Sequence, residues 1–194
     1  NYSSGKMGFA LAEACAEAGA EVMLVAGPVS LKTNHSSIDR IDVESAEEMY
    51  RAVLSEYDRS DIAIMCAAVA DYAPETVSDV KLKRTGEDRI LRLRPNPDIA
   101  AELGRRKRPG QCLVGFALET NDEEMNARLK MEKKNLDFIV LNSLRDAGAG
   151  FQCDTNKVTV IGKQGKPVEI PCKPKIAVAA DIVDIIGRYV SEDR

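Results

Sequence analysis

One apolar run followed by a row of small residues constrains this chain more than any other stretch. Residues 61–65 (Asp-Ile-Ala-Ile-Met) leave little room for a polar face, which is typical of a strand buried on both sides of a parallel sheet. Small residues then run from Cys66 to Ala70 and end at the carboxylate of Asp71. Because ligands of open α/β sheets bind beyond the carboxyl ends of the strands, this stretch predicts a ligand site.

Positive charge follows this strand end within a short distance. Lys81, Lys83 and Arg84 form a cationic cluster, and Lys81 and Lys83 share one face if the segment is extended. A carboxylate and several cations near a tight strand end indicate a polar, phosphorylated ligand. The residues alone favour this hypothesis only slightly over a core strand followed by a solvated, charged loop.

The first third of the chain alternates strands and helices. A glycine loop at residues 3–8 leads into an alanine-rich helix that ends at Gly19, and strands are predicted at 21–25 and 38–43. Ser45 and Glu48 form a capping box that opens the next helix. This order predicts right-handed crossovers and a Rossmann-like, doubly wound α/β fold with a mainly parallel sheet.

The rest of the chain adds two hairpins to this pattern. Residues 77–84 and 89–94 are predicted to be the extended arms of a protruding hairpin, and Pro97 lies near the first position of a short helix. The remaining predicted elements are strands at 112–120 and 137–142, a charged helix at 121–135, a C-terminal β-hairpin at 157–170 and a last helix at 175–190. We expect one domain, 1–194, that lacks its N-terminal strand because the sequence opens inside a motif.

Composition excludes several classes of function. His35 is the only histidine, so a histidine metal site or a Ser-His-Asp triad is not expected. The five cysteines are scattered, which argues against a zinc knuckle or a disulfide framework and favours the cytoplasm. A net charge of −4 and the lack of long apolar runs argue against nucleic-acid and membrane partners.

The glycine loop resembles two nucleotide-binding motifs but lacks a required residue of each. A P-loop needs Ser or Thr where Met7 stands, and a dinucleotide fingerprint needs glycine where Ser3 stands. The following strand also lacks an acidic residue at its tip. These mismatches weigh against an NAD(P)-binding reductase, which is kept as an alternative. An inactive fragment that binds a nucleotide and dimerises is a further alternative.

Seven short motifs occur together in one order along nearly the whole chain. They are Asn1-x-Ser-Ser-Gly-Lys-Met-Gly8, Ala26-Gly-Pro-Val-Ser30, Ala67-Ala-Val-Ala-Asp-Tyr72, Lys81-x-Lys83, Asn96-Pro-Asp-Ile99, Gly115-Phe-Ala-x-Glu-Thr120 and Lys133-Lys-Asn-Leu-Asp137. This set resembles phosphopantothenoylcysteine synthetase, the second activity of the bacterial bifunctional coenzyme A biosynthesis flavoprotein.

The resemblance implies a CTP-dependent ligase. Such an enzyme activates the carboxylate of 4′-phosphopantothenate with CTP and Mg²⁺, and L-cysteine then attacks the acyl-cytidylate intermediate. The resemblance also implies a homodimer, held by the hairpin at 77–94, and a possible upstream fusion to a flavin-dependent decarboxylase domain. No flavin site is expected in this part of the chain, and the resemblance assigns none of its residues as metal ligands.

The resemblance assigns roles residue by residue. Asn1 and Lys81 are expected to be catalytic, and Asn1, Ala67 and Ala68 to contact the acyl substrate. The residues expected to bind the nucleotide are Met65, Cys66, Ala67, Asp71, Lys81, Pro97, Asp98, Ile99, Ala100, Phe116, Lys130 and Lys134. Arg84 departs from the family pattern, in which a third lysine is common.

Overall fold

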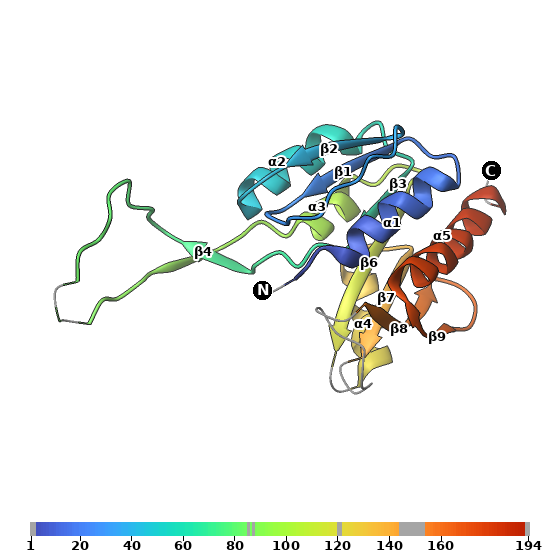
Figure 1. Ribbon diagram of the computed structural model, residues 1–194. Helices are drawn as coiled ribbons and strands as arrows, with labels where there is room; N and C mark the ends of the chain where they lie inside the picture. Colours follow the sequence, from blue (N-terminus) through green and yellow to red (C-terminus); the bar gives the residue numbers. More distant parts are fainter. Residues whose placement is uncertain (1–2, 85, 87, 120–121, 144–153, 193–194) are drawn as a thin grey trace.

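The computed structural model describes residues 3–84, 86, 88–119, 122–143 and 154–192, and shows a layered α/β body with one long arm (Figure 1). The elements in chain order are α1 (Lys6–Glu17), β1 (Val22–Ala26), β2 (Ile38–Asp42), α2 (Ala46–Tyr57), β3 (Ile62–Met65), β4 (Tyr72–Pro74), β5 (Leu93–Pro95), α3 (Ile99–Arg106), β6 (Cys112–Glu119), α4 (Glu123–Lys133), β7 (Phe138–Ser143), β8 (Thr155–Gly162), β9 (Val168–Pro174) and α5 (Lys175–Glu192).

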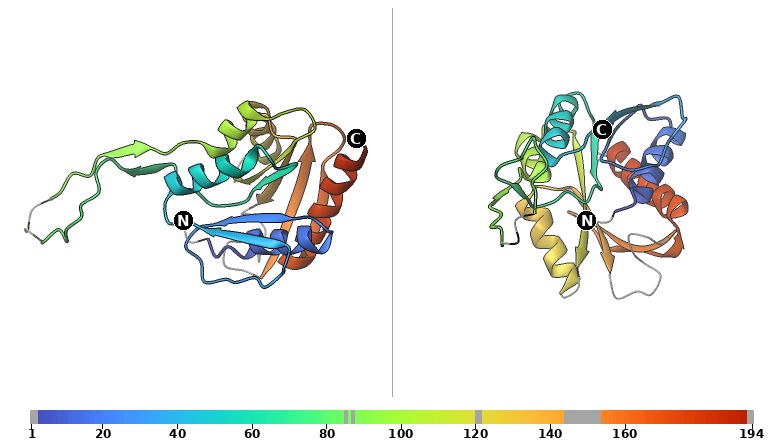
Figure 2. Two further views of the ribbon diagram at one scale, coloured as in Figure 1. Left: turned by 90° about the horizontal axis from the view of Figure 1, so that it is seen from above. Right: turned by 60° about the vertical axis from the view of Figure 1, so that its left-hand side comes forward.

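Five strands form the central sheet in the order β3–β6–β7–β8–β9. The first three pair in parallel, and β8 and β9 add an antiparallel hairpin at one edge. Helices α1 and α5 pack on one face, while α2, α3 and α4 pack on the other (Figure 2). The predicted α/β fold with a C-terminal hairpin is therefore confirmed.

Strands β1 and β2 form a separate parallel pair. Val25 of β1 nevertheless packs in the same apolar core as Ala63 and Met65 of β3, and β1 lies on the side of β2 that is nearer to β3 (Figures 1 and 2). Among the described residues, no backbone ladder joins β1 to β3. The two sheets are thus one layer that is interrupted between two strand edges.

This interruption corrects the expectation that residues 61–65 are buried on both sides. Ile62 is 38% exposed, and the other residues of β3 are only half-buried. The physical reason is that β3 pairs only with β6 within the part of the chain that is described.

The helix ends show which local predictions were correct. In α2, the Ser45 Oγ accepts a hydrogen bond from the Glu48 N–H at 3.1 Å, as the capping box predicts, while the Glu48 carboxylate accepts from the Glu44 N–H. Helix α1 begins at Lys6, inside the stretch predicted to be a loop, because Gly5 adopts a left-handed conformation (φ 77°) directly before it. Pro97 is not in the first turn of α3, since Asp98 is the N-cap.

Among the described residues, the backbone ladder of the arm is confined to its base. Tyr72–Pro74 and Leu93–Pro95 form the antiparallel pair β4–β5, and the Glu75 N–H donates to the Arg92 carbonyl at 2.9 Å. Of the arms predicted to be extended over 77–84 and 89–94, only Leu93 and Arg94 lie in a strand among the described residues. A two-stranded ribbon with no core behind it is only marginally stable, which explains the short ladder.

No helix among the described residues is long and apolar enough to cross a membrane.

Candidate active site

The carboxyl ends of β3, β6 and β7 meet at one edge of the central sheet, where the small residues after β3 begin. Met65 pairs in register with Gly115, so Phe116 lies one residue beyond the end of β3. Cys66 and Phe116 are half-buried and pack against the core under α1, and Ala67 is exposed. The structure therefore brings these three predicted residues together at the carboxyl ends of β3 and β6.

Cys66 contributes shape to this site and not a nucleophile. Burial raises the pKa of its thiol to about 12, and the nearby Lys175 only partly offsets this. Since the thiolate is the reactive form of cysteine, a neutral Cys66 is expected to be inert at neutral pH.

The base of the arm joins the end of β3 to the turn that precedes α3. The Asn96 N–H donates to the Asp71 carbonyl at 2.8 Å, and the Asn96 side-chain amide donates to the Ala70 carbonyl at 2.9 Å. These two bonds place Pro97 and Asp98 beside the small residues that follow β3. The Asp71 side chain itself is exposed at this edge.

Asp98 and Lys134 bring the N-terminus of α3 to the C-terminus of α4. The Asp98 carboxylate accepts a hydrogen bond from the Ala101 N–H at 3.1 Å, and its two oxygens lie 3.0 and 2.9 Å from the Lys134 Nζ. Burial alone would raise the pKa of Asp98, but the Lys134 ammonium, the Ala101 N–H and the charge of Lys130 together lower it. One predicted cation, Lys134, and one predicted carboxylate therefore meet at this point, and the charge of Lys130 also acts on Asp98.

The glycine loop leads into a helix whose N-cap residue, Gly5, provides no side-chain cap. The Ser4 Oγ accepts from the Lys6 N–H at 3.5 Å and the first turn has no acidic residue, so the other N–H groups of this turn suit an anion. The Lys6 Nζ lies 2.5 Å from the Asp154 carboxylate at the start of the C-terminal hairpin. Asn1 lies outside the described residues, so its predicted role is not tested.

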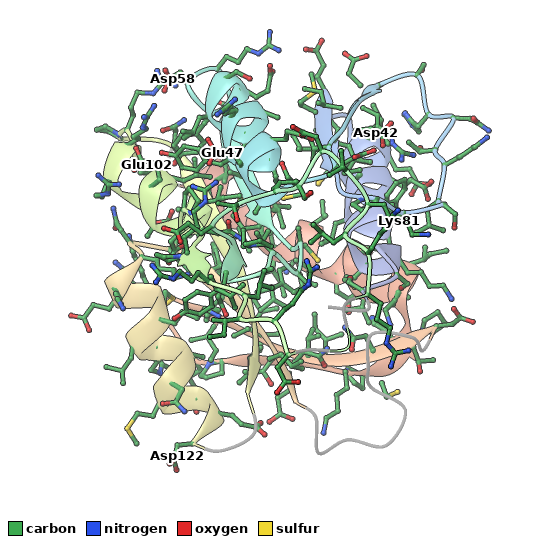
Figure 3. The ribbon with its side chains drawn as sticks, turned by 90° about the vertical axis from the view of Figure 1, so that its left-hand side faces the viewer. Asp42, Glu47, Asp58, Lys81, Glu102 and Asp122 are labelled. Atoms are coloured by element: carbon green, nitrogen blue, oxygen red, sulfur yellow. The ribbon has the colours of Figure 1, made fainter. Side chains whose placement is uncertain are left out.

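Lys81 stands apart from the other predicted residues. It is exposed on the arm, which projects away from the body in Figure 1 and toward the viewer in Figure 3. Within one chain, the structure does not bring Lys81 to the strand ends.

Several polar residues at the two ends of the central sheet received no role from the sequence. Asn142 at the end of β7 and Asn156 in β8 carry buried side-chain oxygens that have no hydrogen-bond partner in the described structure. Asn135 and Asp137 hold the turn after α4, close to Lys134. The only sequence signal for Asn135 and Asp137 was that both belong to the motif at 133–137.

The described part of the chain contains no group of three or more His, Cys, Asp or Glu side chains that could hold a metal ion. A bound Mg²⁺ in nucleotide sites usually keeps several waters and takes phosphate oxygens with one or two carboxylates. The exposed Asp71 suits that kind of site better than a cage made of protein ligands.

Comparison with known proteins gives consistent matches over most of the chain. The family described as "DNA/pantothenate metabolism flavoprotein C-terminal domain" matches residues 1–189. The chain is 54% identical over 183 residues to "Cysteine/Cysteine sulfinic acid decarboxylase" from an unknown prokaryotic organism, covering 94% of this chain and 51% of that protein. It is 49% identical over 187 residues to "Coenzyme A biosynthesis bifunctional protein CoaBC" of Bacillus subtilis (strain 168), covering 96% of this chain and 46% of that protein.

A solved structure shares the fold as well as the sequence. The crystal structure of the C-terminal domain of a coenzyme A biosynthesis bifunctional protein CoaBC matches with a TM-score of 0.82 at 38% identity, over 99% of this chain and 86% of that one. The chain spans about half the length of the curated relatives that it matches.

Proposed function

The chain belongs to the DNA/pantothenate metabolism flavoprotein C-terminal domain family, and on this premise we propose that it is a CTP-dependent ligase that joins 4′-phosphopantothenate to L-cysteine in coenzyme A biosynthesis. The observation that carries the proposal is the contact of Asp98 with Lys134 beside the small residues after β3, with Lys130 one helical turn earlier on α4. A cationic pair next to an open strand end suits a triphosphate.

The reaction explains why such residues are needed. A carboxylate oxygen of phosphopantothenate attacks the α-phosphorus of CTP, and the bond to pyrophosphate breaks to leave an acyl-cytidylate. The amine of cysteine then attacks the acyl carbon, an amide forms, CMP leaves and the amine gives up a proton. Lys130 and Lys134 would stabilise the charge that develops on the phosphates, and binding both substrates at this strand end would align the carboxylate with the phosphorus. Mg²⁺ bound with CTP would add charge neutralisation at the phosphates.

The decarboxylase name of one relative does not compete with this proposal. That protein is about twice as long as the region it shares with this chain, so its name describes a larger molecule. We propose that this chain is the ligase half of such a protein and that a flavin-dependent decarboxylase domain is encoded upstream.

We also propose that a strand of the longer protein lies between β1 and β3. Both strands belong to parallel pairs, share one apolar core and lack a ladder to each other in the described residues. A strand in this position would complete the central sheet and cover the open edge of β3.

The arm is proposed to hold two copies together. Its exposed apolar side chains include Val77 (85% exposed), Val80 (73%), Leu82 (61%), Ile90 (95%) and Leu91 (66%). Monomers rarely expose so many apolar groups on one segment. In a dimer the arm of one copy would carry Lys81 to the strand ends of the other, which would unite Lys81 with the rest of the site.

The function is tested by following pyrophosphate release from CTP in the protein with its natural upstream sequence. Release should require phosphopantothenate and become catalytic when cysteine is added. In Lys81→Ala, kcat/KM should fall roughly 10²–10³-fold if this cation stabilises the transition state. Lys166→Ala, an exposed lysine in the turn between β8 and β9, is the matched control. NADPH binding without pyrophosphate release would instead favour the reductase.

The arm is tested by sedimentation velocity on the same protein carrying Val77→Asp and Ile90→Asp. In the unmodified protein, two copies of this domain should associate through their arms. The variant should lose this association, because two buried charges would replace apolar contacts. Pyrophosphate release should be lost together with the dimer if Lys81 acts across it. A variant that stays dimeric through this domain, or a dissociated variant that keeps its activity, would contradict the proposal.

A further inference from the structure

The C-terminus of α4 is held in a defined turn that ends at Asn135. The Asn135 N–H donates to the Glu132 carbonyl at 3.1 Å, and the Leu136 N–H donates to the Met131 carbonyl at 2.9 Å. Asn135 itself is left-handed, with φ 50°. This is a Schellman ending, and its left-handed position is usually filled by glycine because glycine has no Cβ.

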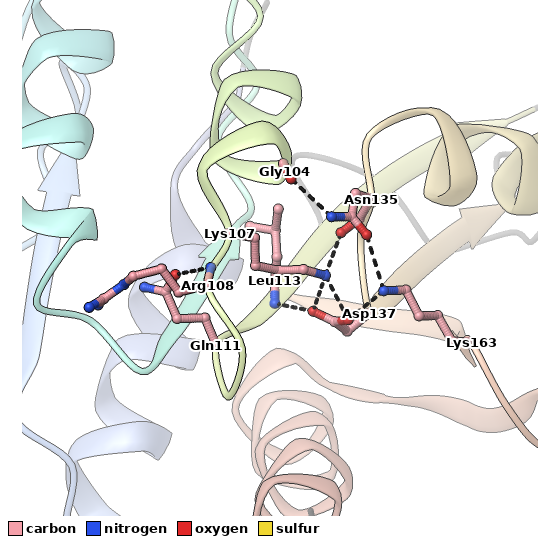
Figure 4. Close-up of polar contacts among 8 residues, drawn as sticks. All are labelled: Gly104, Lys107, Arg108, Gln111, Leu113, Asn135, Asp137 and Lys163. Carbon is pink, nitrogen blue, oxygen red and sulfur yellow. Dashed lines mark hydrogen bonds and ion pairs between the residues drawn. The ribbon is translucent and has the colours of Figure 1, made fainter.

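The side chain of Asn135 explains why glycine is not used here. Its amide nitrogen donates to the Gly104 carbonyl of α3 at 2.9 Å, and its amide oxygen lies 3.2 Å from the Lys163 Nζ (Figure 4). Its backbone carbonyl accepts from the Lys107 Nζ at 2.7 Å. One residue therefore connects α3, the end of α4 and the β8–β9 turn.

The buried carboxylate of Asp137 binds the same two lysines, Lys107 and Lys163. It accepts hydrogen bonds from the Leu113 N–H at 2.8 Å, from the Lys107 Nζ at 2.8 and 2.9 Å and from the Lys163 Nζ at 2.8 Å (Figure 4). Asn135 thus connects Lys134, the residue directly before it, to a polar network that Asp137 anchors.

The contact with α3 bears directly on Lys134. Helix α3 passes so close to the end of α4 that a Cβ on Gly104 would lie 1.9 Å from the Lys134 carbonyl oxygen. The Asn135 amide bridges this contact, and Asp98 at the start of α3 pairs with the Lys134 Nζ at its other end.

We propose that Asn135 is a positioning residue, which ties α3 to the end of α4 so that the Lys134 ammonium is held beside Asp98 and the nucleotide. The inference rests on the proposed function for its consequence, the affinity for CTP. Its structural content, the placement of Lys134, does not depend on any ligand.

Asn135→Gly is the sharpest probe, because glycine keeps the left-handed backbone without strain and removes only the amide. The first readout needs no ligand: the Asp98 carboxyl is titrated by NMR in the wild type, in Asn135→Gly and in Lys134→Ala. Lys134 and Lys130 are the cations that act on Asp98. We expect the apparent pKa of Asp98 to rise in Lys134→Ala and to rise part of the way in Asn135→Gly.

The second readout is the Kd for CTP, measured by calorimetry. One lost hydrogen bond predicts a roughly threefold to tenfold weaker Kd in Asn135→Gly. The effect should disappear in the Lys134→Ala background, because Asn135 acts through Lys134. Lys133→Ala, in the exposed neighbour, should leave both readouts unchanged.

The outcomes separate the two ideas. An Asp98 titration in Asn135→Gly that matches the wild type overturns the positioning role, and so does a loss of CTP affinity that persists without Lys134. A wild-type protein that does not bind CTP sinks the proposed function instead, and the Asp98 titration then decides the positioning role alone.

Discussion

Replacing Asp137 with asparagine is expected to lower the free energy of unfolding by about 3–5 kcal/mol, the range measured when one partner of a buried ion pair is removed. Only 7% of the Asp137 side chain is exposed, and it neutralises Lys107, which is 9% exposed, and the half-exposed Lys163. Asparagine can still accept from the Leu113 N–H, but it carries no charge to offset the ammonium of the mostly buried Lys107. Urea unfolding at neutral pH measures the change.

Asp154→Asn is the matched control. Asp154 also pairs with a lysine, Lys6, and its pKa is also lowered by that lysine, but its side chain is 85% exposed. Exposed pairs contribute little, so the control should unfold as the wild type does. Equal effects of the two substitutions would contradict the view that burial gives Asp137 its importance.

The same carboxylate predicts how stability depends on pH. Burial alone would raise the pKa of Asp137, but hydrogen bonds from Lys107 and Lys163 outweigh it and lower the pKa below its ordinary value. A lowered pKa in the folded state means that the stabilisation is complete above the unfolded value, about 3.9. It is then lost as the pH falls through the folded value. Asp137→Asn should therefore show a shallower acid loss of stability than the wild type.

Local patterns in the sequence predicted the elements of this fold well. The capping box at Ser45, the stop at Gly19 and the apolar run of β6 depend on neighbouring residues only, and each was confirmed. The start of α1 was misplaced, because the left-handed Gly5 begins the helix earlier than the glycine pattern indicates.

Contacts between distant residues could not be read in the same way. Asp98 and Lys134 are 36 positions apart, and no local sequence pattern around either residue predicts their contact. The sequence predicted only that Lys130 and Lys134 share a helix face. The role of Asn135 was also hidden, since its amide becomes meaningful only when α3 lies against the end of α4.

Gly104→Ala is expected to destabilise the protein by about 1–3 kcal/mol or more, the range for overpacking a core. The new Cβ would lie 1.9 Å from the Lys134 carbonyl oxygen and 2.8 Å from its carbon, and both atoms belong to a backbone that is held by the Schellman turn. Alanine would otherwise favour a helix by up to about 1 kcal/mol over glycine, so the clash must exceed that gain. Thermal and urea unfolding measure the balance.

The same substitution at Gly187 in α5 is expected to have the opposite effect on stability. A Cβ on Gly187 would meet no atom within 4 Å, so alanine should stabilise the protein by up to about 1 kcal/mol. If Gly104→Ala were as harmless as Gly187→Ala, α3 and α4 would not be in close contact, and the link from Asn135 to Lys134 would lose its physical basis. If Gly104→Ala folds but moves α3, Asp98 should separate from Lys134, and the pKa of Asp98 should rise as it does in Lys134→Ala.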